Sequence, residues 1–347
     1  MSTVATIRKL DVKHGTIEMS HGSGGRAMSQ LIQELFIRYF DNDLLRQQND
    51  QASFSVAAGR MVMATDAHVI SPLFFPGGDI GSLAIHGTIN DVAMAGARPL
   101  YLAAAFVIEE GFPLCDLERI VASMARASKE AGVPVVTGDT KVVERGNADG
   151  IYITTTGVGV VPEGVVLSGD QARAGDHVIL SGAIGNHGMA ILSCRQNLGF
   201  NTAIESDSAA LHTLVAAMLA VAPNIRCLRD ATRGGLAAVL NEWAQQSAVG
   251  FKLDEEQIPV HEQVAGACEL LGLDPLHVAN EGKLVAVVSA PESEALLAAM
   301  QSHPLGGEAA IIGEVVADDR CFVSMQTRFG GTRMVDWLAA EQLPRIC

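Results

Sequence analysis

The chain has 347 residues, of which 48% are hydrophobic and 18% are charged. It is too apolar for a disordered protein, and its length suggests two domains. The 24 Lys and Arg residues against 39 Asp and Glu give a net charge of −15, which argues against binding to nucleic acid or to an anionic membrane.

The N-terminal residues contain no apolar segment of the kind found in signal peptides, and no stretch is long and apolar enough to predict a membrane span. Six cysteines are scattered along the chain without a Cys-x-x-Cys pair. This spacing indicates neither a zinc ribbon nor a disulfide framework, so we expect a cytoplasmic protein.

In the first half of the chain, apolar residues alternate between helical and strand spacing. Helices are predicted over residues 27–40, 79–96 and 116–131, and strands over 61–65, 101–108, 133–137 and 151–161. Proline, glycine, serine and aspartate then loosen the pattern over residues 162–176, where we place a domain boundary.

A second series of strands and helices follows the boundary. Strands are predicted over residues 177–181, 225–229, 283–289, 309–316 and 320–325, and helices over 208–221, 234–247 and 292–301. The sequence therefore predicts an α/β protein with domains at residues 1–165 and 166–337, followed by a tail at 338–347.

Aspartates stand at the predicted ends of three strands, namely Asp66, Asp139 and Asp230, and Asp79 and Asp91 lie on the helix that follows the first. Strand ends hold side chains rigidly at ligand sites of α/β proteins. Several carboxylates that converge would suit Mg²⁺, with phosphate oxygens completing its shell. The alternative is that these aspartates cap helices and form turns.

Glycine-rich stretches at residues 22–25, 182–188 and 234–235 could approach phosphate groups through backbone N–H groups. None matches the P-loop pattern. Each could also be a tight turn, although His21 and Arg26 flank the first stretch and favour an anion site there.

Four further residues have two interpretations each. Lys141 could neutralise a phosphate or pair with Asp139 at the surface, and Glu281 could be a general base or a turn residue. His86 and Asn90 share a helix face, which suits a core contact as well as a site.

The last residue is Cys347, on a tail of about ten residues that could swing up to ~33 Å if fully extended. A terminal thiol is a freely presented nucleophile or carrier group. The alternative is an incidental frayed end.

Several motifs taken together resemble one family over essentially the whole chain. They are His21-Gly-Ser-Gly-Gly25, Thr65-Asp66-Ala-His68, the stretch from Pro76 to His86, the stretch from Asn90 to Pro99, Thr137-Gly-Asp-Thr-Lys141, the stretch from Arg229 to Gly235, Asn280-Glu-Gly-Lys283 and the Pro344-Arg-Ile-Cys347 ending. The chain resembles the HypE family of hydrogenase maturation factors, the carbamoyl dehydratases. This family lies in the superfamily of aminoimidazole ribonucleotide synthetase and selenophosphate synthetase.

The resemblance implies a two-domain PurM-like fold and a homodimer in which N-terminal mixed sheets form a shared barrel, with a C-terminal α/β sandwich domain and a flexible tail. It implies that Cys347 receives a carbamoyl group from the carbamoyltransferase HypF. ATP with Mg²⁺ would then dehydrate the thiocarboxamide to a thiocyanate, and a HypC–HypD complex would take the cyanide for the iron of nickel–iron hydrogenase.

The resemblance also implies residue roles. These are Mg²⁺ ligands at Asp66, Asp91, Asp139 and Asp230, ATP contacts at those four and at Gly24, Gly25, Asn90 and Thr140, and catalytic roles for His86, Lys141, Glu281 and Cys347.

Two other classes stay open. A sibling synthetase would use ATP in the same fold, but residues 14–26 lack the cysteine common in selenophosphate synthetases, and the aminoimidazole ribonucleotide enzyme needs no terminal cysteine. A non-enzymatic thiol carrier would not need the strand-end acids.

Overall fold

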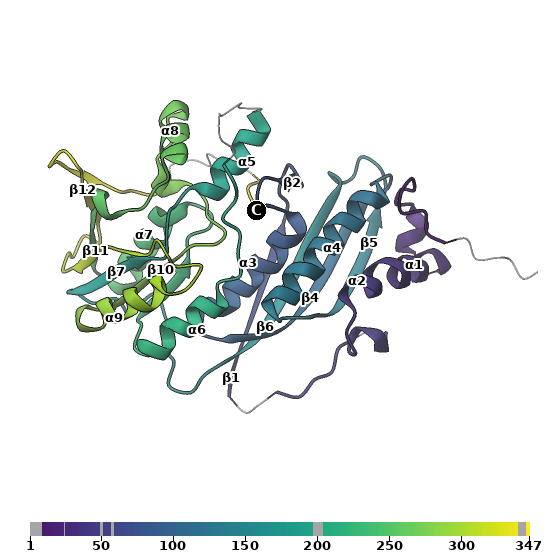
Figure 1. Cartoon of the computed structure of the whole chain (residues 1–347), viewed down its shortest axis with the longest axis horizontal. Coiled ribbons are helices and arrows are strands. Elements are labelled where there is room, and N and C mark those ends of the chain that lie inside the picture. The colour runs from purple at the N-terminus through teal and green to yellow at the C-terminus, as the bar shows by residue number, and fades with distance from the viewer. Residues whose placement is uncertain (1–8, 24, 49–50, 57–58, 197–203, 339–344) are drawn as a thin grey trace, which may run out of the picture.

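The chain forms two large sheets that lie side by side, as the computed structural model in Figure 1 shows. The structure describes residues 9–23, 25–48, 51–56, 59–196, 204–338 and 345–347. All strands of the four-stranded sheet fall within residues 60–161, and all strands of the seven-stranded sheet within 176–334. The predicted two-domain α/β organisation is confirmed.

The N-terminal sheet has the strand order β1-β6-β4-β5, in which only β4 and β5 run parallel. Its strands are β1 (Arg60–His68), β4 (Arg98–Glu109), β5 (Val135–Val143) and β6 (Ile151–Val161), beside a small hairpin of β2 (Phe74–Phe75) and β3 (Gly78–Asp79). Its helices are η1 (Met19–Gly22), α1 (Arg26–Leu31), η2 (Ile32–Ile37), α2 (Arg38–Phe40), η3 (Leu45–Gln47), α3 (Ile80–Met94) and α4 (Leu114–Ala131).

One face of this sheet is covered by α3 and α4 (Figure 1), because both helices present apolar side chains to it. On α4, Leu117, Ile120, Val121 and Met124 recur at helical spacing and are buried. We call the covered side the inner face. The outer face is largely open to solvent, and Met63 on it is 74% exposed.

The C-terminal sheet has the order β13-β12-β9-β11-β7-β10-β8, and only β9 and β12 are parallel. Its strands are β7 (Asp176–Leu180), β8 (Cys227–Asp230), β9 (Gly250–Asp254), β10 (Leu284–Ser289), β11 (Ala310–Val316), β12 (Val323–Gln326) and β13 (Thr332–Met334). Its helices are α5 (Asn186–Gln196), α6 (His212–Val221), α7 (Gly235–Ser247), η4 (Glu255–Gln257), α8 (Glu262–Leu271), η5 (Pro275–His277) and α9 (Ala290–Gln301). Helix α7 packs on one face, and α6 and α9 pack on the other.

The two domains meet along α3. This helix contacts β1 and β6 of its own sheet and also β8 and α6 of the second domain. A helix buried between two sheets is apolar around most of its circumference, and Ile80, Leu83, Ile85, Ile89 and Val92 all have no exposed surface. Side chains from both domains therefore converge around α3.

Some predicted elements differ from the structure. β1 and β5 are longer than predicted, so Asp66 and Asp139 lie inside strands and not at their ends, whereas Asp230 does end β8. Helices α5 and α8 and strand β9 were not predicted, and α6 begins four residues later than predicted. In α8, Val264, Ala267, Cys268 and Leu271 have helical spacing before Gly272, a signal that was available.

Within the described ranges, no helix has both the length and the apolar character needed to cross a membrane.

Candidate functional site

Four carboxylates from both domains gather beside α3. Asp66 comes from β1, Asp91 from α3, Asp230 from the end of β8, and Glu281 from the loop before β10. Asp230 and Glu281 are buried, whereas Asp66 and Asp91 keep surface exposed to solvent. We call these four residues the carboxylate cluster.

Burial and mutual repulsion raise the pKa values of three cluster members. Desolvation raises the pKa of Asp230 to about 7, and Asp91 and Asp66 add to it. Desolvation, with Asp66 nearby, raises the pKa of Asp91 to about 6. The pKa of Glu281 lies well above its ordinary value, because the side chain is buried beside Asp230 and other acids. Such a cluster of acids favours a cation between them.

The cluster fits Mg²⁺ by its chemistry. Asp230 Oδ2 and Glu281 Oε1 are buried and have no hydrogen-bond partner among the described residues. Buried carboxylate oxygens without partners are costly, and oxygen ligands are those that Mg²⁺ prefers. Among the described residues, no three His, Cys, Asp or Glu side chains already stand close enough to hold a metal ion. Mg²⁺ would therefore need to draw the acids together or be held partly by phosphate oxygens.

Asp207 borders the cluster and was not among the residues predicted from the sequence. Its Oδ1 accepts a hydrogen bond of 3.2 Å from the Glu281 backbone N–H, and its Oδ2 lies 3.5 Å from Lys283 Nζ. Asp207 lies in an irregular segment before α6. No strand end and no glycine motif lies next to it, so no local signal marks it as a site residue.

His68 is a second residue that sequence reasoning left without a role, although it was part of a quoted motif. The ring is buried, and Nε2 lies 3.3 Å from Asp66 Oδ2 without the geometry of a hydrogen bond. Desolvation lowers the pKa of His68, although the Asp66 charge opposes the shift. A neutral imidazole therefore stands beside the cluster.

His86 and Asn90 lie on α3 and bond to the segment that carries Asp207. The Asn90 amide donates to the carbonyl oxygens of Ala209 (3.0 Å) and Glu281 (3.2 Å) and accepts from the Leu211 N–H (2.7 Å). His86 Nδ1 lies 2.9 Å from Ser208 Oγ, and burial lowers the pKa of His86 to about 4. In this structure both residues join the domains, as in the core-contact interpretation.

Asp79 and Gly25 both lie at the start of a helix, but only Asp79 caps its helix with a side chain. Asp79 caps α3, where its carboxylate accepts from the N–H groups of Gly81 (2.7 Å) and Ser82 (3.0 Å), so the capping interpretation is correct for it. Gly25 is the N-cap of α1, and a Cβ there would meet open space. Gly24 lies outside the described residues.

Asp139, Thr140 and Lys141 lie on β5, away from the carboxylate cluster. Strand register aligns Asp139 with Ala105 on β4, then with β6 and with Ala67 on β1. Asp139 and Ala67 are therefore three strand spacings apart, a distance of about 14 Å. Asp66 faces inward, whereas Asp139 and Lys141 point to the outer face. Within one chain, the structure does not bring these two groups together.

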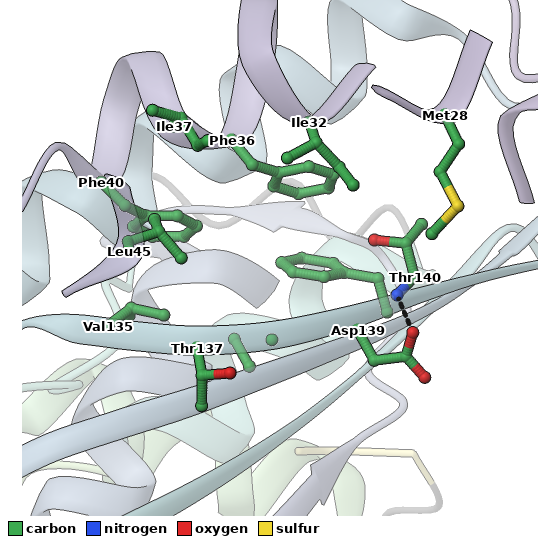
Figure 2. Close-up of a pocket in the computed structure, with 13 residues that line it drawn as sticks. Met28, Ile32, Phe36, Ile37, Phe40, Leu45, Val135, Thr137, Asp139 and Thr140 are labelled. Carbon is green, nitrogen blue, oxygen red and sulfur yellow. Dashed lines mark hydrogen bonds between the residues drawn. The ribbon is translucent and has the colours of Figure 1, made fainter. Parts of the chain in front are cut away.

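Asp139 and Lys141 form an exposed ion pair at 2.6 Å, which is one of the two interpretations left open. The Lys141 hydrogen bond is the main reason that the pKa of Asp139 falls below its ordinary value. Behind them, η2 and β5 enclose a cavity of about 110 Å³ that is mostly apolar (Figure 2). A larger hollow of about 600 Å³ shares Met28 and Asp139 and reaches Gly25, so the glycine stretch and β5 border one open space.

The C-terminal end of the chain lies between the two domains, near β2 and α5 (Figure 1). Ile346 is 3% exposed and belongs to the main apolar cluster of the protein. The Val69 N–H donates to the main-chain oxygen of Cys347 at 3.1 Å, and Arg345 Nε donates to the Val69 carbonyl at 2.9 Å. Arg345 also pairs with Asp149.

This docked end binds a residue that lies three positions after Asp66 of the carboxylate cluster. Val69, whose N–H binds the Cys347 main-chain oxygen, directly follows His68, whose ring contacts Asp66. The structure thus brings a terminal thiol residue and the acids to the same junction between the domains. Of the predicted tail, residues 339–344 lie outside the described residues.

The chain is similar to known proteins over most of its length. It matches the AIR synthase related protein N-terminal domain over residues 48–161 and the corresponding C-terminal domain over residues 173–326. It is 69% identical over 339 residues to the carbamoyl dehydratase HypE of Azotobacter vinelandii, covering 98% of this chain and 99% of that protein.

Two solved structures are also similar over most of the chain. A crystal structure of the hydrogenase maturation protein HypE in complex with ATP is 48% identical, with a TM-score of 0.92, and the match covers 95% of this chain and 99% of that one. A HypE–HypF complex contains a chain that is 50% identical, with a TM-score of 0.79, over 89% of this chain and 99% of that one. The sequence identity, the two matched domains and the shared fold show that the chain belongs to the HypE family of carbamoyl dehydratases, with its PurM-like architecture.

Proposed function

We propose that this enzyme of the carbamoyl dehydratase family uses ATP to dehydrate a thiocarboxamide carried on Cys347 to a thiocyanate. The product supplies the cyanide ligand for the iron of nickel–iron hydrogenase. The observation that carries the proposal is the docked C-terminal end, with Ile346 buried and Cys347 held beside the segment that bears Asp66. The 69% identity to a named carbamoyl dehydratase supports the same reaction.

The chemistry requires an activated oxygen and a base. In a thiocarboxamide, S–C(=O)–NH₂, the oxygen is a poor leaving group and both N–H protons must be lost to form S–C≡N. ATP, when bound, supplies the phosphoryl group that makes this oxygen leave as phosphate, and Mg²⁺ supplies positive charge at the phosphates. The protein must position the amide and accept a proton from its nitrogen.

Glu281 is suited to accept that proton. Burial beside other acids raises the pKa of Glu281 well above the ordinary value, so a cation in the cluster is needed to keep it ionised, and the ionised carboxylate then accepts a proton readily. Its Oε1 has no hydrogen-bond partner among the described side chains and backbone, so it is available to an N–H group when the aspartates hold the Mg²⁺. The loop is fixed by Asn90, which binds the Glu281 carbonyl at 3.2 Å.

Asp66, Asp91 and Asp230 would hold Mg²⁺, because they belong to the carboxylate cluster, whose members repel one another without a cation. Gly24, Gly25, Asn90 and Thr140 stay predictions as ATP contacts, and His86 stays a prediction as a catalytic residue. A bound structure of a HypE at 48% identity supports ATP binding by this chain.

Lys141 and Asp139 lie on the outer face of the sheet, on the third strand from β1. They therefore require a second protomer to act on the same bound thiocarboxamide and phosphate as Glu281. The outer face exposes Met61, Met63 and Val107, so it would bury apolar surface in a homodimer. We propose that the N-terminal sheets pair through this face into a shared barrel. Lys141 would then stabilise phosphate charge, and Asp139 would contribute to Mg²⁺ binding, at the partner's site.

Further parts of the proposal concern partners, location and boundaries. We propose HypF as the carbamoyl donor, which a solved HypE–HypF complex at 50% identity supports, and a HypC–HypD complex as the acceptor of cyanide. The cytoplasm suits the unbridged internal cysteines. The domain boundaries at 165/166 and 337/338 stay predictions.

The test is the mass of the C-terminal peptide. After incubation with HypF, a carbamoyl donor and ATP, we expect a carbamoyl adduct on Cys347 that converts to a cyano adduct only when ATP and Mg²⁺ are present. A Cys347→Ala variant serves as the control and should carry neither. An adduct on any of the five internal cysteines instead would contradict the proposal.

A further inference from the structure

His187 contacts the docked end of the chain from α5. Its imidazole has no exposed surface and stacks edge-on against Phe75, with ring centroids 5.6 Å apart. One ring nitrogen, Nε2, lies 2.8 Å from the Ile346 carbonyl oxygen, and the other, Nδ1, lies 2.8 Å from Ser206 Oγ. The ring therefore joins the tail to the segment that carries Asp207.

The chemistry of the partners fixes the direction of these hydrogen bonds. The Ile346 carbonyl can only accept, so His187 Nε2 carries a proton and donates. Burial lowers the pKa of His187, so the ring is neutral and Nδ1 accepts from the Ser206 hydroxyl. Ser206 Oγ in turn accepts from the Ser208 N–H at 3.2 Å. The three donors, His187 Nε2–H, the Ser206 hydroxyl and the Ser208 N–H, thus each have one acceptor.

The segment around Ser206 is tightly confined next to Glu281. The Ser206 N–H donates to the Pro76 carbonyl at 2.8 Å, and the next residue, Asp207, accepts from the Glu281 N–H at 3.2 Å. A Cβ at Gly77 or Gly282 would overlap the backbone of this segment, so only glycine allows the close approach. A displacement of Ser206 is therefore transmitted to the backbone of Glu281.

We propose that His187 is a positioning residue that couples docking of the C-terminal tail to the placement of Glu281. It rests on the proposed function, in which the docked tail is the state that undergoes dehydration. With the tail docked, the Ile346 carbonyl orients the ring, the ring orients Ser206, and Asp207 holds the Glu281 loop. With the tail undocked, Nε2–H loses this acceptor and the series of hydrogen bonds ends at an unsatisfied donor.

The experiment separates docking from catalysis with two readouts on the full-length protein. Docking is measured as the rate at which iodoacetamide alkylates Cys347, quantified on the C-terminal peptide by mass spectrometry. Catalysis is measured as the single-turnover conversion of carbamoylated protein to the cyano form with saturating ATP and Mg²⁺. The alkylation assay needs neither ATP nor HypF, so it reports docking even if the proposed function is wrong.

Three variants break the connection at different points. Ser206→Ala keeps the bond to the tail, so alkylation should stay within twofold of wild type while dehydration slows about tenfold. His187→Gln can place its Nε2 amide near the tail carbonyl but cannot reach Ser206, and it should behave like Ser206→Ala. His187→Ala should slow dehydration and also raise the alkylation rate about tenfold, because the tail loses a buried hydrogen bond.

Either of two results would overturn the proposal. One is wild-type dehydration by Ser206→Ala and His187→Gln, which would show that the relay does not reach Glu281. The other is an unchanged alkylation rate in His187→Ala, which would show that the ring does not hold the tail. Because His187→Gln preserves size and polarity, it keeps the test informative if His187→Ala folds poorly. A wild-type protein that docks but never forms the cyano adduct would instead contradict the proposed function.

Discussion

Replacing Ile346 with alanine should release the C-terminal tail from its docked position. The side chain is 3% exposed, and the change removes three carbon groups from the main apolar cluster. At about 0.8 kcal/mol for each buried methylene, docking should weaken by about 2.4 kcal/mol. This corresponds to a shift of about 50-fold toward the undocked state.

The loss should be seen mainly in docking. The Ile346 carbonyl is bound by His187, and its neighbours are held by a few hydrogen bonds to residues 69–71, so the tail can leave while both sheets stay intact. A matched control is Ile108→Ala on β4, which removes the same atoms from a side chain with no exposed surface. That variant should lower the free energy of unfolding by about 2–5 kcal/mol.

Cys347 reactivity distinguishes the two variants. In Ile346→Ala, the iodoacetamide alkylation rate of the C-terminal peptide should rise by up to about 50-fold, because Cys347 is only partly exposed in the docked end. In Ile108→Ala, the rate should stay at the wild-type value in native buffer while the urea midpoint falls. Equal alkylation of wild type and Ile346→Ala would refute the reasoning, as would an equal increase in both variants.

Three other predictions concern the carboxylates and the outer face. Burial raises the pKa of Asp230 to about 7, so the folded protein binds more protons than the unfolded chain between about pH 4 and pH 7 and loses stability as the pH rises through that window. In urea unfolding without Mg²⁺, Asp230→Asn should reduce this loss by up to about 4 kcal/mol, and an unchanged pH slope would contradict the assignment. Asp66→Asn and Asp139→Asn should each abolish Mg²⁺-dependent ATP turnover while circular dichroism stays native, and wild-type turnover in both would remove these residues from the site. Met63→Glu, at a side chain that is 74% exposed on the outer face, should convert a dimer to a 36.4 kDa monomer in light scattering, whereas a wild-type protein that is monomeric at micromolar concentration would rule out the dimer.

Local pattern was sufficient for some of the regular elements, though not for α5 and α8. The helical spacing over 116–131 predicts α4, and the strand before Asp230 ends where predicted, because apolar periodicity records which face a segment buries. Motif resemblance identified Glu281 and Asp91, and the structure brings them together with Asp66 and Asp230. These parts were predictable because each depends on neighbours along the chain or on a short motif.

The placement of Asp139 and Lys141 was decided only by the sheet. Side chains alternate between faces along a strand, so the register of β5 against β4 directs these two residues to the outer face while Asp66 points inward. No local pattern contains that register. The same is true of Asp207, His187 and the docked Ile346, whose partners lie 74 to 159 residues away in the sequence. Their contacts exist because α3 and two sheets close around one junction, and long-range packing of this kind leaves no periodic signal in the segments that it joins.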